Sequence, residues 1–127
     1  MQFLVSTAGA GEAEIIAGLK EQGHVGHGMG ELGEGVDVRD VAGLFTALAE
    51  KQWGLVTNDN ALVRRVYEEG VRFDYTIVLL LEGVEAAGAM GRLFERYKRL
   101  SAGRLYTVTG TRVKIRQLPG SAGGGGR

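Results

Sequence analysis

The chain contains no cysteine, only one proline and no long apolar run. Without cysteine, neither a disulfide framework nor a thiolate metal site is possible, which fits a reducing compartment. The longest apolar run, Ile77 to Leu81, is far too short to cross a bilayer. The segment MQFLVSTAGAGEAE also lacks the basic start and the longer apolar stretch of a signal peptide. We therefore expect a cytoplasmic protein with no membrane partner.

An excess of charge of either sign is absent as well. Fifteen basic and fifteen acidic residues give a formal net charge of zero. Bulk charge therefore gives no reason to expect a nucleic-acid partner, and any such contact requires a local group of cations.

Three cations near the C-terminus form the best local group. Arg112, Lys114 and Arg116 alternate with Val113 and Ile115, as expected for one face of a strand. We expect this face to contact RNA phosphates, or else to be a solvated face whose charges block pairing between sheet edges. Further basic candidates are Arg64, Arg65, Arg92, Arg96, Lys98 and Arg99.

The length of 127 residues fits one domain. Glycine is unusually abundant, at 22 residues, and part of the excess lies in the terminal SAGGGGR. That segment has no apolar side chain worth burying. We therefore expect a folded domain over residues 1–119 and a disordered glycine-rich tail over residues 120–127.

Short apolar runs alternate with segments whose apolar residues recur at helical spacing. The expected strands are 2–6, 24–27, 54–57, 75–81 and a hairpin formed by 104–108 and 111–116. The expected helices are 12–22, 38–51, 61–69 and 86–100. The glycine-rich segment 28–35 is expected to be a loop.

This alternation predicts an α/β fold with a mainly parallel central sheet that helices cover on both faces. The C-terminal β-hairpin would add antiparallel strands at one edge. In such sheets the functional site lies beyond the carboxyl ends of the strands. Three places qualify: Ser6 and Thr7, residues 57–60, and Glu82.

Aspartates stand where two of these helices are expected to begin. Asp40, or Asp37 one turn earlier, precedes the helix 38–51, and Asp59 precedes the helix 61–69. Both carboxylates would lie near one edge of the sheet. Convergent carboxylates suit Mg²⁺ or Mn²⁺, because these ions take oxygen ligands and keep several waters. Each aspartate is also a candidate N-cap of its helix. One carboxylate can serve both as N-cap and as metal ligand.

The order of these motifs resembles that of the PIN-like domains, in the short branch related to the VapC toxins. The matching segments, in order, are QFLV, EQGHV, the loop Gly30 to Gly35, RDVAGLFTALAE, LVTND, YTIVLLLEG and RLYTVTGTRVKIRQLP. The resemblance covers about the first 119 residues. It implies a three-layer α/β/α PIN-like domain and a ribonuclease of toxin–antitoxin type that depends on Mg²⁺ or Mn²⁺. It also implies a homodimer and a small antitoxin protein as partners.

The same resemblance assigns the candidate site. It implies Asp40 and Asp59 as catalytic residues, and Asp37, Asp40 and Asp59 as metal ligands, with Glu12 as a further acidic candidate. In the family, the metal held by such residues activates a water for phosphodiester cleavage.

The departures from the family pattern fall on this site. The family's first aspartate corresponds to Ser6, so one carboxylate is missing, and we expect weak or absent activity. In one interpretation, the hydroxyl of Ser6 or Thr7 replaces the missing carboxylate and holds a water or a phosphate. In the other, the site has lost its function. Thr57, next to Asn58, is expected to orient Asp59 through a local hydrogen bond. The alternative function is a catalytically inactive PIN-like module that binds RNA or a protein partner.

Two other interpretations follow from single residues. His24 and His27 are three residues apart in an expected strand, so they should point to opposite faces and share no metal. Trp53, at the start of an expected strand, is interpreted as an anchor at the edge of the core. A plain doubly wound domain without nuclease ancestry would be preferred if the strands 2–6 and 54–57 were not adjacent.

Overall fold

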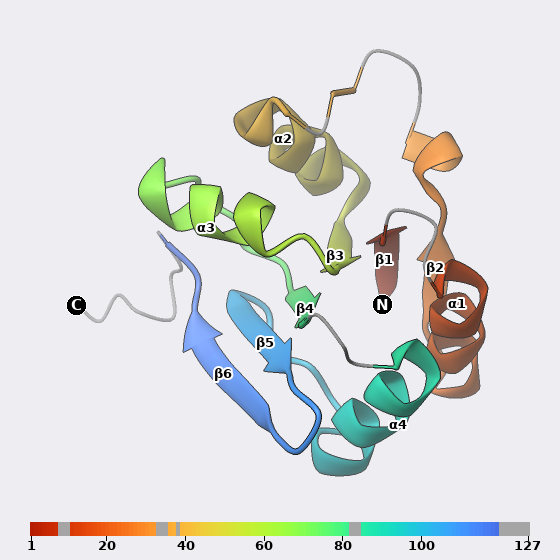
Figure 1. Cartoon of the computed structure of the whole chain (residues 1–127). Helices are drawn as coiled ribbons and strands as arrows, with labels where there is room; N and C mark the ends of the chain where they lie inside the picture. Colours follow the sequence, from red (N-terminus) through yellow and green to blue (C-terminus); the bar gives the residue numbers. More distant parts are fainter. Residues whose placement is uncertain (8–10, 33–35, 38, 82–84, 120–127) are drawn as a thin grey trace.

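The computed structural model describes residues 1–7, 11–32, 36–37, 39–81 and 85–119. Over these residues the chain is an α/β domain with a six-stranded, mostly parallel sheet and four α-helices (Figure 1). The strands are β1 (Gln2–Ser6), β2 (Val25–His27), β3 (Trp53–Thr57), β4 (Ile77–Leu80), β5 (Arg104–Val108) and β6 (Val113–Gln117). The helices are α1 (Glu12–Glu21), α2 (Val41–Lys51), α3 (Asn60–Glu68) and α4 (Ala86–Arg96), with a short 3₁₀ helix η1 (Met29–Leu32).

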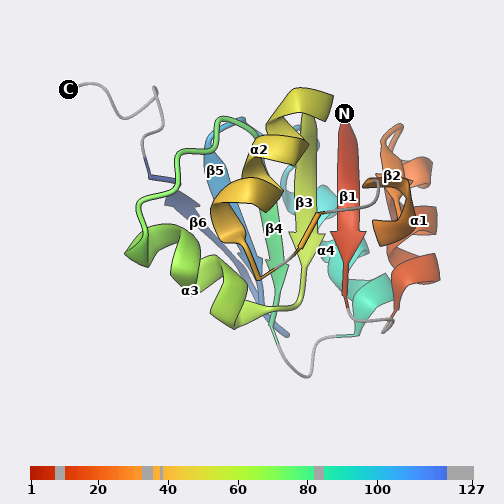
Figure 2. The ribbon, with the colours of Figure 1, turned by 90° about the horizontal axis from the view of Figure 1, so that it is seen from above.

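The strand order is β2-β1-β3-β4-β5-β6. The first five strands are parallel, as the arrows of β1, β3 and β4 show in Figure 2, and only β6 is antiparallel to its neighbour. The expectation that both arms of the hairpin are antiparallel additions was therefore wrong for β5. Helix α4 returns the chain to the starting end of the sheet, so β5 pairs parallel with β4. The order reverses between β1 and β3, and such a switch point opens a crevice at the carboxyl ends of the strands.

Helices cover both faces of the sheet. Helices α2 and α3 lie on one face, and α1 and α4 lie on the other (Figure 1). Alternate residues of each strand enter the two separate cores: Leu4 packs on the α2–α3 side, whereas Phe3 and Val5 pack on the α1–α4 side. Burial on both faces explains why the strands are continuous apolar runs instead of alternating patterns.

Gly54 allows the central strands to come close together. A Cβ atom at this position would lie 2.6 Å from the carbonyl oxygen of Thr76 and 2.8 Å from the ring of Phe3. Both neighbours are fully buried, so neither has free space to move into. A glycine inside a buried strand is thus explained by the close approach of backbone and ring.

Two expected helices are shorter in the structure. The helix expected over 38–51 begins at Val41, because Asp40 occupies the N-cap position. The helix expected over 86–100 ends at Arg96, and the chain continues in an extended conformation. The remaining expected strands and helices are present, with ends that differ by at most two residues.

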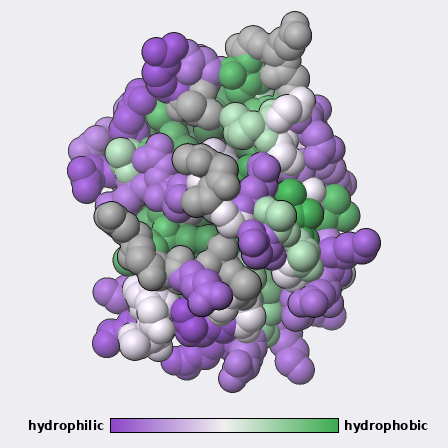
Figure 3. Space-filling view, turned by 45° about the vertical axis from the view of Figure 1, so that its right-hand side comes forward, coloured by the Kyte–Doolittle hydropathy of each residue, from purple (hydrophilic) through white to green (hydrophobic). Residues whose placement is uncertain are grey.

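Several expectations fall on residues outside the described part of the chain: Glu82, Val38, the end of the glycine-rich loop 28–35, and the tail 120–127. Among the described helices, none is both long and apolar enough to cross a membrane. On the face shown in Figure 3, hydrophilic side chains surround smaller areas of apolar residues. The large apolar side chains that are exposed are those of Met1, Val25 and Ile115, which are not neighbours in sequence.

Candidate functional site

The carboxyl ends of β1 and β3 lie side by side at the switch point of the sheet. Ser6 and Thr57 are partners in the parallel register, and alternation along the strands places both on the α2–α3 side. The side-chain amide of Asn58 donates to the carbonyl oxygen of Thr7 at 3.2 Å, which ties the two strand ends together. The structure thus brings together all four polar residues that the sequence placed around the site.

Asp59 lies directly after this strand end and caps α3. One carboxylate oxygen accepts a hydrogen bond from the backbone N–H of Leu62 at 3.1 Å. The backbone N–H of Asp59 donates to the hydroxyl of Thr57 at 3.1 Å, and this is the local hydrogen bond that the sequence predicted. Because an N-cap uses one carboxylate oxygen, the second oxygen of Asp59 remains for a water or a ligand.

The other two aspartates are held by local partners. Asp40 caps α2, with one carboxylate oxygen accepting from the N–H of Gly43 at 3.1 Å. Asp37 accepts two hydrogen bonds, each of 3.1 Å, from the Arg39 guanidinium and a third of 2.8 Å from its backbone N–H. These bonds hold the pKa of Asp37 below its usual value. Arg65 donates to the carbonyl oxygen of Arg39 at 2.8 Å and so links this segment to α3.

Within the described part of the chain, no three His, Cys, Asp or Glu side chains gather closely enough to hold an ion. Glu12, the further candidate, lies at the start of α1 beside Gly28. The strand ends offer hydroxyl and amide groups and one capping carboxylate, that of Asp59, whereas a protein-bound Mg²⁺ ion usually takes one or two carboxylates and keeps several waters.

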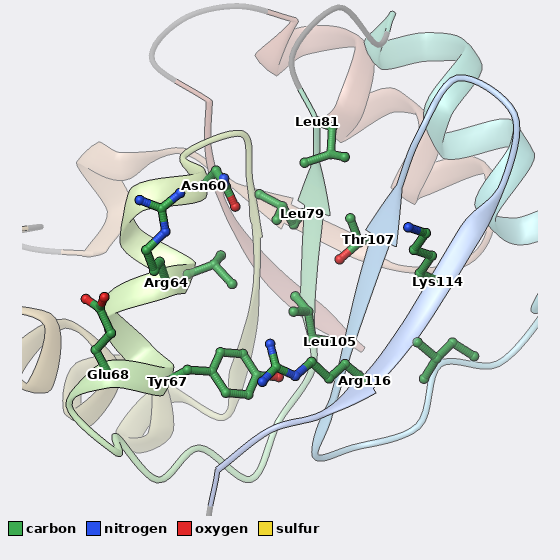
Figure 4. A pocket seen from close by; sticks show the side chains of 12 residues that line it. Asn60, Arg64, Tyr67, Glu68, Leu79, Leu81, Leu105, Thr107, Lys114 and Arg116 are labelled. Atoms are coloured by element: carbon green, nitrogen blue, oxygen red, sulfur yellow. The ribbon is translucent and has the colours of Figure 1, made fainter.

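A groove of about 520 Å³ lies between α3 and the strands β4, β5 and β6 (Figure 4). Its apolar surface includes Val63, Leu79 and Leu105. Its three cations, Arg64, Lys114 and Arg116, come from α3 and β6, and one carboxylate, Glu68, also lines it. Two of the three cations expected to contact RNA, Lys114 and Arg116, therefore lie in the groove, and Arg112 is exposed just before β6.

Two contacts beside the groove join α3 to β6. The Cζ atom of Arg116 lies 3.9 Å from the centroid of the Tyr67 ring. The Tyr67 hydroxyl donates to the carbonyl oxygen of Gln117 at 2.8 Å. Burial raises the pKa of Tyr67, and the positive charge of Arg116 acts in the opposite direction. Figure 4 shows the two side chains meeting across the groove.

Lys114 in the groove and the polar strand ends share one row of the sheet. Ser6, Thr57, Leu79, Thr107 and Lys114 are successive register partners across five strands. With about 4.8 Å between neighbouring strands, Lys114 lies roughly 19 Å from Ser6. Both features therefore lie toward the carboxyl end of the parallel strands, where ligands bind in such sheets.

The two histidines lie on opposite faces, as expected. His24 stacks on Phe94, in the core on the α1–α4 side, with ring centroids 5.2 Å apart. His27 stacks on Trp53, at the edge of the other core, with centroids 3.9 Å apart. Its Nδ1 lies 2.9 Å from a carboxylate oxygen of Glu31, and this hydrogen bond lowers the pKa of Glu31.

The sequence analysis did not identify Tyr67 or the apolar floor as parts of a site. A signal was present on α3, since Asn60, Arg64 and Tyr67 follow one another at spacings of four and three residues and so share one face. The floor had no such signal, because Leu79 and Leu105 are indistinguishable in sequence from ordinary core residues.

Comparison of the chain with protein-family models, curated proteins and solved structures gives no match. The interpretation of the site consequently rests on the residues of this chain and on their geometry.

Proposed function

We propose that this chain is a PIN-like domain of three-layer α/β/α architecture that binds single-stranded RNA without cutting it efficiently. The groove between α3 and β6 is the observation that carries the proposal. It combines apolar side chains with three cations from α3 and β6. Grooves that bind single-stranded nucleic acid without regard to sequence combine positive charge with aromatic side chains on which bases stack, and Tyr67 is the aromatic residue of this groove.

The charge of the groove supports an anionic ligand. The whole chain is neutral, yet three cations and a single carboxylate line the groove. Among the described residues, neither Arg64 nor Lys114 belongs to an ion pair. Lys114 and Arg116 are two residues apart on one strand face, which separates them by roughly 6.6 Å along the strand. Cations in such a row can contact successive phosphates of one strand.

The proposed PIN-like architecture rests on the order of the motifs and on the topology. Strands β1 and β3 are adjacent, so the condition that would favour a plain doubly wound domain is not met. The order β2-β1-β3-β4-β5 is shared with other doubly wound folds. The family assignment is therefore part of the proposal.

Weak cleavage follows from the strand ends. Ser6 stands where the family has its first aspartate, and its register partner is the buried, uncharged Thr57. Two carboxylates in the neighbourhood, Asp40 and Asp59, already cap helices.

A second candidate is a residual ribonuclease that uses Mg²⁺ or Mn²⁺. It is favoured by the second carboxylate oxygens of Asp40 and Asp59, since the cap hydrogen bonds use only one oxygen of each. A small antitoxin and a second copy of the chain would be the partners of such an enzyme.

Binding of a labelled pool of single-stranded RNA, followed by fluorescence anisotropy, tests the proposal. In the double variant Arg64→Gln/Lys114→Gln we expect weaker RNA binding. The slope of log binding constant against log salt concentration should become less steep by about 0.7 for each lost phosphate contact. The matched control is Lys20→Gln/Arg96→Gln, which removes one lysine and one arginine from the exposed surface of α1 and α4. Cleavage of the same pool with Mn²⁺ is measured in parallel.

If both double variants lost RNA affinity equally, only the total charge of the protein would matter for binding. The groove would then not be the RNA-binding site. Absence of binding by the wild type would sink the RNA proposal and favour a protein partner. Cleavage that requires Mn²⁺ and is lost in Asp59→Asn would instead establish the residual ribonuclease, because asparagine keeps the helix cap.

A further inference from the structure

The guanidinium of Arg116 lies over an aromatic ring at the surface of the groove. Its Cζ atom is 3.9 Å from the centroid of the Tyr67 ring, a separation at which the two groups are in van der Waals contact. Arginine is suited to such contacts, because its guanidinium is planar, delocalised and more weakly hydrated than an ammonium group. The contact therefore joins a flat cation to an aromatic ring (Figure 4).

The protein itself holds the Tyr67 ring in place. The ring packs against the core on the α2–α3 side. Its hydroxyl donates at 2.8 Å to the carbonyl oxygen of Gln117, the residue that follows Arg116. The ring is therefore anchored to the same strand that carries the guanidinium. A contact that is formed before a ligand arrives reduces the conformational entropy that binding has to remove.

Arg116 remains available for a further partner. The residue is exposed, and among the described residues its guanidinium belongs to no ion pair. The other cation that lies over an aromatic ring is Lys51, 5.1 Å from the centroid of Trp53. Lys51 has no planar surface, and the Trp53 ring is already stacked on His27. Within the described part of the chain, only Arg116 presents a guanidinium that an aromatic ring supports.

Two further cations lie near this pair. Lys114 precedes Arg116 by two residues on the same face of β6, at a distance of roughly 6.6 Å along the strand. Arg64 lies three residues before Tyr67 and shares its face of α3. A phosphate next to a base that covers Arg116 would therefore meet Lys114 or Arg64. The bases of single-stranded RNA stack on aromatic side chains and on the guanidinium planes of arginine.

We infer that an RNA base stacks on the outward side of the Arg116 guanidinium, which the Tyr67 ring supports from the inner side. This inference rests on the proposed RNA binding and assigns the residue that meets the bases. Arg116 makes the contact, and Tyr67 is a positioning residue. Every base has a π-face, so any base satisfies the contact. The contact therefore distinguishes a chain that carries bases from a bare polyanion, and does not distinguish one sequence from another.

The test compares, by fluorescence anisotropy, a single-stranded RNA with a chain of the same length and charge built from stable abasic residues. We expect the wild type to bind the RNA at least about tenfold more tightly. Arg116→Lys keeps the charge and removes the planar surface. It should lose most of this preference while the dependence of binding on salt stays unchanged. Arg112→Lys, the same change at an exposed position just before β6, is the matched control and should keep the preference.

The outcomes separate the inference from the proposed function. An equal preference for the RNA in Arg116→Lys and Arg112→Lys would overturn the inference while leaving RNA binding intact. Equal affinity of the wild type for the RNA and the abasic chain would overturn it as well. Absence of binding to both chains would instead overturn the proposed function.

The positioning role of Tyr67 is tested through the same preference. Tyr67→Phe keeps the ring and should keep the preference for the RNA over the abasic chain. Tyr67→Leu removes the aromatic support of the guanidinium and should lose the preference, as Arg116→Lys does. An unchanged preference in Tyr67→Leu, even with lower affinity for both chains, would contradict the positioning role. Should Tyr67→Leu fail to fold by circular dichroism, the comparison of Arg116→Lys with Arg112→Lys decides.

Discussion

Ser6 and Thr57 are paired in register at the carboxyl ends of two adjacent parallel strands, where neither side chain carries a charge. The resemblance to the PIN-like domains places the family's first aspartate at Ser6. The capping Asp59 follows two residues after Thr57. Under the proposed PIN-like assignment, the carboxylate missing at Ser6 can be restored by a single substitution.

We predict that Ser6→Asp creates a binding site for Mn²⁺. The new carboxylate adds a negative charge and an oxygen ligand beside the strand end of β3. We expect affinity for Mn²⁺ to rise at least about tenfold, or about 1.4 kcal/mol, over the matched Ser6→Asn variant, measured by calorimetry. The gain should disappear in Ser6→Asp/Asp59→Asn. Equal affinities of Ser6→Asp and Ser6→Asn would show that this strand end is not an ancestral metal site.

A second prediction separates capping from charge at Asp59. Its carboxylate accepts the N–H of Leu62, so Asp59→Ala should lower the free energy of unfolding by about 1 kcal/mol. Asp59→Asn keeps an oxygen in the same place and should remain within a few tenths of a kcal/mol of the wild type. Urea denaturation measures both. Equal losses in the two variants would mean that the charge, and not the cap, stabilises this end of α3.

The third prediction concerns Gly54. The Cβ atom of Gly54→Ala would meet the Thr76 carbonyl and the Phe3 ring well inside normal contact distances. We expect a loss of about 1 to 3 kcal/mol in the free energy of unfolding, the usual cost of overpacking a core. Gly91→Ala, at an exposed position of α4 with open space around it, is the control and should stabilise by about 0.5 to 1 kcal/mol. A neutral Gly54→Ala would contradict the close packing of β3 against its neighbours.

The fourth prediction concerns alkaline pH. Burial raises the pKa of Tyr67 above its ordinary value of about 10. At a pH between the ordinary pKa and the raised pKa of the folded state, the folded state holds a proton that the unfolded state has lost. The free energy of unfolding should therefore fall as the pH rises from about 10 through the folded pKa. Tyr67→Phe removes the ionising group, and its stability should fall less over this range.

The measurement is thermal denaturation of wild type and Tyr67→Phe across this range of pH. Near neutral pH the variant should be less stable by about 1 kcal/mol, because it lacks the hydrogen bond to the Gln117 carbonyl. Parallel curves for the two proteins at alkaline pH would show that Tyr67 is not perturbed by its surroundings.

Local patterns in the sequence predicted much of the fold. The strand over 2–6 has the predicted bounds, since a short apolar run buried on both faces has a clear pattern. The capping positions of Asp40 and Asp59 were also predictable, because an aspartate before an apolar helical pattern is a strong start signal.

The sequence-based predictions failed where a structural feature depends on parts of the chain that are distant in sequence. The direction in which β5 pairs is determined by the α4 crossover, and nothing within Arg104–Val108 encodes it. The groove was equally hidden, since its walls come from α3 and β6, which the whole of β4, α4 and β5 separates in sequence. The cations of β6 could be predicted from the sequence, whereas the α3 surface that faces them across the groove could not.

The last strand has a consequence for the time at which the protein becomes competent to bind. Strand β6 supplies Lys114, Arg116 and the carbonyl group that anchors Tyr67. During translation, five strands and all four described helices precede it out of the ribosome. A nascent chain can thus assemble most of its sheet while its groove still lacks a wall. Under the proposed function, RNA binding therefore requires that β6 has been synthesised and has paired with β5.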